Sequence, residues 1–330
     1  MFIINNITEF FATKIPLGSW VEGLVNFIVN NFSGPLDQFA NIIGSLIDAF
    51  EVLLSEGQPF GHPLIIIILI VGFLWKEKDY QWALGTGVVL AVLSAIFLGW
   101  QSSYNLGYPL LLIIIFALIA GKIKSYKLAI FVIIGLGLMW NLNLWGAVVR
   151  TLSSIITSVM VALIIGVPVG ILKAHSKIVD LITRPILDFM QTIPPFVYLI
   201  PALMFFGLGN VSGVIATVVF CIAPPIRLTY LGITQVDDEV LEAGRAFGCN
   251  WWEMLYKIEL PCALPSIMMG INQCIMLALS MVVIAAMIGA GGLGKPVLRA
   301  LSIIDIGLGF EAGLGVVIIA MVLDRMFGRE

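Results

Sequence analysis

Residues 242–261 read EAGRAFGCNWWEMLYKIELP, a stretch in which charged and aromatic side chains stand close together. The chain around it is far more apolar: of its 330 residues 60% are hydrophobic and 11% are charged, and the mean hydropathy is +1.07. A soluble domain carries about 25% charged residues. The composition therefore indicates a protein with several membrane spans, in which residues 242–261 form a polar island.

The spans are expected to be helices. Open backbone cannot face lipid, and uninterrupted apolar runs such as residues 267–288 are too long for the alternating pattern of a barrel strand. The expected fold is an all-α polytopic helical bundle with about seven to nine spans. Hydropathy indicates nine candidates: residues 64–75, 82–99, 106–120, 128–144, 152–172, 195–208, 211–231, 264–288 and 306–323.

Two short helices joined at a glycine are predicted for residues 237–261, which we call the knuckle. Either of the two leading aspartates would start the first helix, because a carboxylate accepts from free N–H groups and complements the helix dipole. Gly248 stands where a helix end favours positive φ. Asn250 followed by Glu253 predicts a capping box for the second helix. Val240, Ala243 and Phe247 then share one helical face.

The knuckle also carries a spaced motif, E-A-G-x3-G-x9-I-x-L-P, which resembles the E-A-A loop of ABC importer permeases. The matching positions are Glu242, Ala243, Gly244, Gly248, Ile258, Leu260 and Pro261. Gly244 departs from the family, which usually has a second alanine there. The resemblance implies that residues 232–261 are a cytoplasmic coupling loop that docks on a separate ATPase, with Phe247 as a mechanical contact and Gly248 setting the angle between the helices.

Three further stretches resemble the permease subunits of glycine betaine and proline betaine importers. They are DFMQTIPPFVYLIPALMFFGLGNV at 188–211, PPIRLTYLGITQV at 224–236 and INQCIMLALSMVVIAAMIGAGGLG at 271–294. The resemblance covers about residues 106–325 and implies the type I ABC importer permease fold. It also implies a homodimer with two cytoplasmic ATPase subunits, which use ATP and Mg²⁺, and an extracytoplasmic substrate-binding protein. No cofactor, metal or nucleic acid is expected on this chain, and no binding domain is expected after the last span.

Four regions follow from these features. Residues 1–58 are expected to lie outside and to contain an amphipathic helix at 36–54 in the membrane interface, because its apolar residues trace one helical face. Residues 59–105 are expected to form an added hairpin of two spans without a counterpart in the family, and residues 106–147 to form peripheral spans. Residues 148–326 are the expected core permease domain.

The basic residues predict an orientation. If the knuckle is cytoplasmic, the inner segments are residues 76–81, 121–127 and 173–185, the knuckle with its approach, and the C-terminus. They hold 13 of the 17 Lys and Arg residues; the other four are Lys14, Arg150, Lys295 and Arg299. This distribution follows the positive-inside rule. The chain is therefore expected in the cell membrane, with its N-terminus outside and its C-terminus in the cytoplasm.

The Gly-rich turn, GAGGLGKP at residues 289–296, matches two phosphate-binding patterns, G-x-G-x-x-G and G-x4-G-K. Neither fits its context. A phosphate loop needs Ser or Thr after the lysine, where this chain has Pro296, and both patterns need a preceding strand, where this chain has a long apolar run. The stretch is interpreted as a flexible outer turn whose glycines permit close helix approach. ATP hydrolysis is assigned to a partner.

The expected substrate is a quaternary ammonium compound, which aromatic faces bind through cation–π attraction. Aromatic residues that could line its path are Phe196, Tyr198, Phe205, Phe206 and Phe220; packing inside the membrane is the competing interpretation. Choline, carnitine, ectoine or another compatible solute stays open as an alternative. So do an ion-driven secondary transporter and a membrane enzyme, the last disfavoured because no catalytic group of residues is evident.

The cysteines and histidines suggest no chemistry. Cys221, Cys249, Cys262 and Cys274 lack paired metal spacing and are expected to be buried, reduced thiols. His62 and His175 lie beside span ends with no acidic neighbour in the sequence, so neither is expected to be catalytic.

Overall fold

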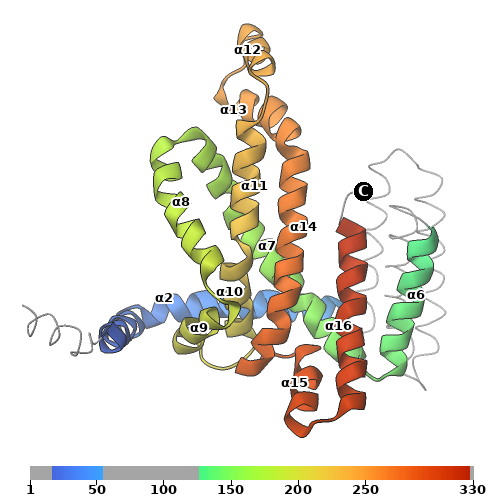
Figure 1. The fold of residues 1–330 in the computed structure, drawn as a ribbon. Helices are drawn as coiled ribbons and strands as arrows, with labels where there is room; N and C mark the ends of the chain where they lie inside the picture. Colours follow the sequence, from blue (N-terminus) through green and yellow to red (C-terminus); the bar gives the residue numbers. More distant parts are fainter. Residues whose placement is uncertain (1–16, 55–125, 328–330) are drawn as a thin grey trace, which may run out of the picture.

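The computed structural model describes residues 17–54 and 126–327, in which every regular element is a helix (Figure 1). The α-helices are α2 (Leu17–Leu54), α6 (Tyr126–Asn141), α7 (Trp145–His175), α8 (Lys177–Thr192), α9 (Leu199–Phe206), α10 (Asn210–Cys221), α11 (Ala223–Thr234), α12 (Asp238–Ala246), α13 (Trp251–Met254), α14 (Leu260–Ala285), α15 (Gly294–Ile303) and α16 (Ile306–Phe327). Two 3₁₀ turns, η1 (Pro195–Tyr198) and η3 (Ala286–Ile288), and a π turn, η2 (Leu255–Glu259), join some of them. The spans expected at 64–75, 82–99 and 106–120 lie outside the described residues.

Four helical stretches of the described chain are long and apolar enough to cross a membrane. They are Trp145–His175, Asn210–Thr234, Trp251–Ile288 and Ile306–Arg325. They coincide with the spans expected at 152–172, 211–231, 264–288 and 306–323. The fold is therefore the all-α membrane bundle that the composition predicts.

The structure differs from two expectations about this region. Residues 173–185, expected as an inner loop, are helical, because α7 continues to His175 and α8 starts at Lys177 after a one-residue break. The span expected at 195–208 is one arm of a bent pair: α8 and the stretch Pro195–Phe206 meet at an angle of 111°. The prolines at 194 and 195 explain the bend, since the first follows the end of α8 and the second opens η1.

Close helix packing shapes the part of the bundle next to the knuckle. A Cβ on Gly170 of α7 would lie less than 3.0 Å from the Thr229 Cβ and the Ile226 carbonyl oxygen of α11. Gly232 of α11 is similarly close to Ala263 and Ser266 of α14. Small residues let membrane helices approach in this way, and here they hold α7, α11 and α14 together.

Helix α2 lies across the bundle, at a steep angle to α11 and α14 (Figure 1). It contains the amphipathic helix expected at 36–54 but is longer, with a kink at Phe32. Ile43 and Ile47 are almost fully buried in the main core, and Glu51 forms an ion pair with Arg150 of α7 with a distance of 3.0 Å between Oε1 and Nε. These contacts attach α2 to α7.

One long helix connects the two ends of the bundle. The stretch Trp251–Ile288 has 38 residues, so at 1.5 Å per residue it is about 57 Å long, against about 30 Å for the hydrocarbon core of a bilayer. It must therefore project beyond the membrane. The knuckle stands at its start and the Gly-rich turn at its end.

Candidate functional site

The knuckle projects beyond the rest of the bundle, with α12 at its tip (Figure 1). As predicted, a glycine joins its two helices: Gly248 has φ +78°, a left-handed conformation. The first helix, α12, is short as predicted, but the second is not, because α13 is the start of the long helix 251–288. The Cys249 N–H donates to the Gly244 carbonyl at 3.1 Å, which closes the end of α12. Asp237 occupies the N-cap position of α12, but its side chain makes no capping hydrogen bond.

The second helix of the knuckle starts at the predicted capping box. The Glu253 N–H donates to Asn250 Oδ1 at 2.9 Å, and the Asn250 N–H donates to Glu253 Oε2 at 3.1 Å. Lys257 lies one turn further on and donates to Glu253 Oε1 at 2.8 Å. These groups belong to the projecting part of the long helix. The Lys257 hydrogen bond and, after it, the Asn250 N–H lower the pKa of the Glu253 carboxyl, so the box keeps its charge.

The motif glycine Gly244, where the family usually has alanine, packs closely against the second helix of the knuckle. It is buried against the second helix, where an added Cβ would meet the Ile258 Cδ1 atom at less than 3.0 Å and crowd the Met254 thioether. Glycine therefore lets α12 lie directly on this helix. Leu260 and Pro261 follow directly after the π turn η2, where α14 begins within the long helix.

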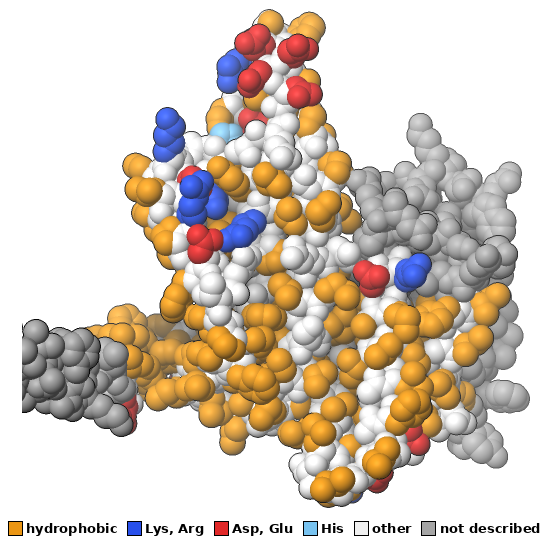
Figure 2. Space-filling model, viewed as in Figure 1, with side chains coloured by type: hydrophobic (Ala, Val, Ile, Leu, Met, Phe, Trp, Pro, Cys, Tyr) orange, Lys and Arg blue, Asp and Glu red, His pale blue; other side chains and the backbone are white. Residues whose placement is uncertain are grey.

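The outer surface of the knuckle is apolar and aromatic between acidic side chains. Val240, Ala243 and Phe247 are all exposed, Phe247 to 89%, as their shared face predicted. Trp252 and Tyr256 stack with ring centroids 6.2 Å apart and are also exposed. Figure 2 shows acidic side chains gathered on the knuckle, while hydrophobic side chains cover the bundle below. Exposed apolar patches rimmed by polar residues are typical of docking sites.

The aromatic residues expected along a substrate path form pairs rather than one cage. Tyr198 and Phe220 have ring centroids 5.8 Å apart, and Tyr198 is buried with its hydroxyl donating to the Met190 carbonyl. The ring centroid of Phe206 lies 6.2 Å from that of Phe39 of α2 and 6.3 Å from that of its neighbour Phe205. Phe196 is 53% exposed. Their role in substrate passage stays a prediction.

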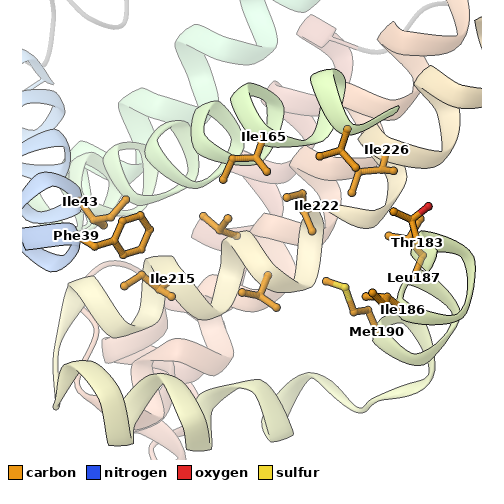
Figure 3. A pocket seen from close by; sticks show the side chains of 13 residues that line it. Phe39, Ile43, Ile165, Thr183, Ile186, Leu187, Met190, Ile215, Ile222 and Ile226 are labelled. Atoms are coloured by element: carbon orange, nitrogen blue, oxygen red, sulfur yellow. The ribbon is translucent and has the colours of Figure 1, made fainter. Parts of the chain in front are cut away.

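A cavity of about 390 Å³ lies between α2, α7, α8, α10 and α11 (Figure 3). None of the five predicted aromatic residues lines it. The one polar side chain in its wall is Thr183, whose hydroxyl donates to the Val179 carbonyl at 2.7 Å, and its one aromatic ring is Phe39. Such a wall suits hydrocarbon and lacks the aromatic faces that hold a quaternary ammonium.

The Gly-rich turn follows helix α14 and the turn η3, which agrees with its rejection as a phosphate loop. The expectation that it is flexible is wrong. The Gly291 N–H donates to Asn210 Oδ1 at 2.5 Å, and the Leu293 N–H donates to Thr151 Oγ1 at 2.8 Å. A Cβ on Gly292 would clash with the same Thr151 oxygen, so glycine permits this close approach. The turn is thus fastened to α7 and α10.

Sequence reasoning missed a contact at the base of the knuckle. His175 has no acidic neighbour in the sequence, but the structure places its Nε2 atom 3.0 Å from Oε2 of Glu259. The two residues are 84 positions apart in the sequence, which hides this pair from any local pattern. The expectation of buried thiols is correct for Cys221 and Cys274; Cys249 is only partly buried, and Cys262 is exposed.

Comparison with known proteins identifies the family. The model of the family described as the inner membrane component of binding-protein-dependent transport systems matches residues 166–327. A glycine betaine/carnitine transport permease protein of Listeria monocytogenes is 43% identical over 94% of this chain and 94% of its own. The chain belongs to this family.

Other relatives of this inner membrane component agree. The glycine betaine/proline betaine transport permease of Escherichia coli is 47% identical over 98% of this chain and 77% of its own. The glycine betaine transport permease of Bacillus subtilis is 48% identical over 66% of this chain and 77% of its own. A solved structure of the MetNI methionine ABC transporter, in an inward-facing conformation, has 20% identity and a TM-score of 0.49 over 53% of this chain and 88% of its own. The predicted resemblance is confirmed, and the alternative of an ion-driven secondary transporter does not fit a binding-protein-dependent family.

Proposed function

We propose that this inner membrane component forms the translocation path of an ATP-driven importer for glycine betaine, proline betaine or a close quaternary ammonium relative. The observation that carries the proposal is the knuckle: a projecting pair of helices with an exposed apolar face, at the position of the E-A-A motif. The substrate class is supported by relatives at 43 to 48% identity that are named as glycine betaine, carnitine or proline betaine permeases. Carnitine is the first alternative substrate, because one of these relatives is named for both solutes.

In the proposed complex, two copies of the chain surround the path and each knuckle docks on one of two cytoplasmic ATPase subunits. ATP and Mg²⁺ bind to those subunits, and an extracytoplasmic binding protein delivers the solute. When the ATPases close, they move the knuckles and switch the helices between inward-open and outward-open states, a rigid-body change of the kind known for transporters. The chain itself supplies shape and coupling, with no catalytic residue.

The docking step is tested by co-purification of the chain with its ATPase. Phe247→Ala removes a side chain that is 89% exposed at the knuckle tip, so it should weaken the complex while leaving the fold intact. The matched control is Phe310→Ala, because Phe310 is 71% exposed on α16, far from the knuckle. Equal ATPase recovery with both variants would contradict docking through Phe247.

The substrate is tested in proteoliposomes that contain the permease, the ATPase and the binding protein. Labelled glycine betaine should accumulate only with ATP inside, and unlabelled proline betaine should compete with it. Stronger competition by carnitine, choline or ectoine would reassign the substrate and leave the transport function in place. Uptake driven by an ion gradient without ATP would contradict the proposal as a whole.

A further inference from the structure

The corner between α7 and α8, residues 173–180, lies at the base of the knuckle. The knuckle has two legs: the end of α11, which leads into it, and the start of the long helix 251–288, which leads out. Two side chains of the corner, Lys173 and His175, make contacts that reach these two legs separately. Because they are two residues apart on α7, their side chains point in nearly opposite directions, about 160° apart around the helix axis.

His175 contacts the outgoing leg twice. Its Nε2 atom lies 3.0 Å from Oε2 of Glu259, and its ring meets the ring of Trp251 edge-on with 5.6 Å between centroids. Its other nitrogen, Nδ1, lies 2.9 Å from the Ile171 carbonyl oxygen, which anchors the ring to α7. Both ring nitrogens therefore face oxygen atoms, one on the outgoing leg and one on α7.

The π turn η2 makes this double contact possible. Trp251 and Glu259 are eight residues apart, and in a regular α-helix they would be rotated by about 80° relative to each other. A π turn holds one residue more than an α turn, so across η2 the two positions align almost as residues seven apart do. Both side chains thus reach one imidazole.

Lys173 contacts the incoming leg and α8. Its side chain is 5% exposed; its Nζ atom lies 3.4 Å from Oδ1 of Asp180 and 4.7 Å from the centre of the Tyr230 ring on α11. The carboxylate oxygens that face these two side chains, Oδ1 of Asp180 and Oε2 of Glu259, are buried and have no hydrogen bond of regular geometry within the described residues. The other oxygen of Asp180 lies 3.4 Å from Arg184 Nη2, so Asp180 has a second basic partner on α8. A buried carboxylate oxygen without a facing donor is costly, which gives both contacts a role in holding the corner.

We propose that Lys173 and His175 form a clamp that holds both legs of the knuckle to the α7–α8 corner. His175 is then a positioning residue for coupling: it makes α7 and α8 move with the knuckle, so that the movement is not absorbed by the π turn. The inference rests on the proposed function, because only a knuckle moved by an ATPase needs such a clamp.

The clamp is tested by the number of solute molecules moved per ATP hydrolysed by the reconstituted complex. His175→Ala should lower this ratio by at least about fivefold, the lower end of coupling between sites, while ATP hydrolysis continues. His175→Gln should recover part of the ratio, since its amide can donate to Glu259. The control is Lys177→Gln, which removes a charge from an exposed position two residues away and should leave the ratio unchanged. If His175 only stabilised the fold, His175→Ala would lower the amount of complex and leave the number of solute molecules moved per ATP unchanged.

A charge exchange separates the contact from the individual residues. His175→Glu alone places two carboxylates together and should uncouple the complex; combined with Glu259→Lys it restores an opposite pair and should recover the ratio. A wild-type ratio in both His175→Ala and His175→Glu, or a double variant no better than His175→Glu, would overturn the clamp and leave the importer assignment standing. A wild-type complex without solute-dependent ATP hydrolysis would refute the proposed function, and the clamp with it.

Discussion

The knuckle and the Gly-rich turn stand at opposite ends of one helix, and both contain glycines, but the surroundings of these glycines differ. Glycines adopt left-handed φ in both, +78° at Gly248 and +84° at Gly289. Around Gly248 there is open space and Phe247 is 89% exposed, whereas Leu293 in the Gly-rich turn is fully buried and its N–H is bonded to α7. The surface of the knuckle is thus exposed, whereas the Gly-rich turn is covered by other helices of the same chain.

The sharpest test of this contrast is the side of the membrane on which each end lies. In a variant without the four native cysteines, Glu239→Cys marks the knuckle and Ser302→Cys marks the opposite end, and both positions are exposed. An impermeant thiol reagent added to intact cells should label position 302 completely and position 239 only after permeabilisation, because the basic residues place the knuckle inside. The reverse pattern would mean an inverted chain and would remove the argument for ATPase docking.

The next largest effect is expected at Gly248. Gly248→Pro forces φ to about −65° where the knuckle needs +78°, and it deletes an N–H that donates to the Arg245 carbonyl. ATP-driven uptake should fall on the order of tenfold or more while the protein still inserts. Gly248→Asn is the control, since Asn tolerates left-handed φ and the space around the Cβ is open. Normal uptake by a normally expressed Gly248→Pro variant would show that the junction angle is unimportant.

A smaller effect on stability is expected at the closed end. Thr151→Val removes the acceptor of the Leu293 N–H and leaves a buried donor unpaired, at a cost of about 1–3 kcal/mol. Thr157→Val is the matched control on the same helix, because the Thr157 hydroxyl donates only to the Ser153 carbonyl one turn before it. Thermal unfolding in detergent should show a clearly lower midpoint for Thr151→Val than for Thr157→Val. Equal midpoints would mean that the turn is not held by this bond.

The smallest effect is expected from Lys295→Ala in the Gly-rich turn. If the turn were a phosphate loop, loss of the lysine would abolish nucleotide binding. A packed turn that binds no nucleotide has no such binding to lose. ATP hydrolysis by the assembled complex should stay nearly intact, with at most a modest loss of uptake through the binding protein. Saturable ATP binding to the isolated permease that disappears in Lys295→Ala would contradict the division of labour between subunits.

Local signals predicted most of this architecture. Apolar runs predicted the spans after residue 145, and the capping box at Asn250 and the positive φ of Gly248 followed from rules that involve neighbours in sequence. Helix α8 was missed because Lys177, Asp180, Arg184 and Asp188 resemble a polar loop in composition. Their spacing of three to four residues puts them on one side of a helix whose opposite face, with Val179, Ile182 and Ile186, is apolar.

What could not be predicted depends on contacts between distant segments. His175 meets Glu259 only because α7 and the long helix pack side by side, and the π turn that aligns Trp251 with Glu259 has no signature in the sequence. The stiffness of the Gly-rich turn likewise comes from Thr151 and Asn210 on other helices. Glycine content alone suggested flexibility, and tertiary hydrogen bonds reversed it.

The long helix from Trp251 to Ile288 joins the knuckle to the Gly-rich turn, so a tilt of this helix moves both ends. Its length of about 57 Å means that a tilt of about 5° around its middle displaces each end by about 2.5 Å in opposite directions. A displacement of that size exceeds what the hydrogen bonds of the Gly-rich turn tolerate. In the proposed complex, a push that tilts this helix would strain those bonds unless α7 and α10 move with the far end. The hydrogen bonds of the turn would then oppose part of the movement that the ATPase imposes.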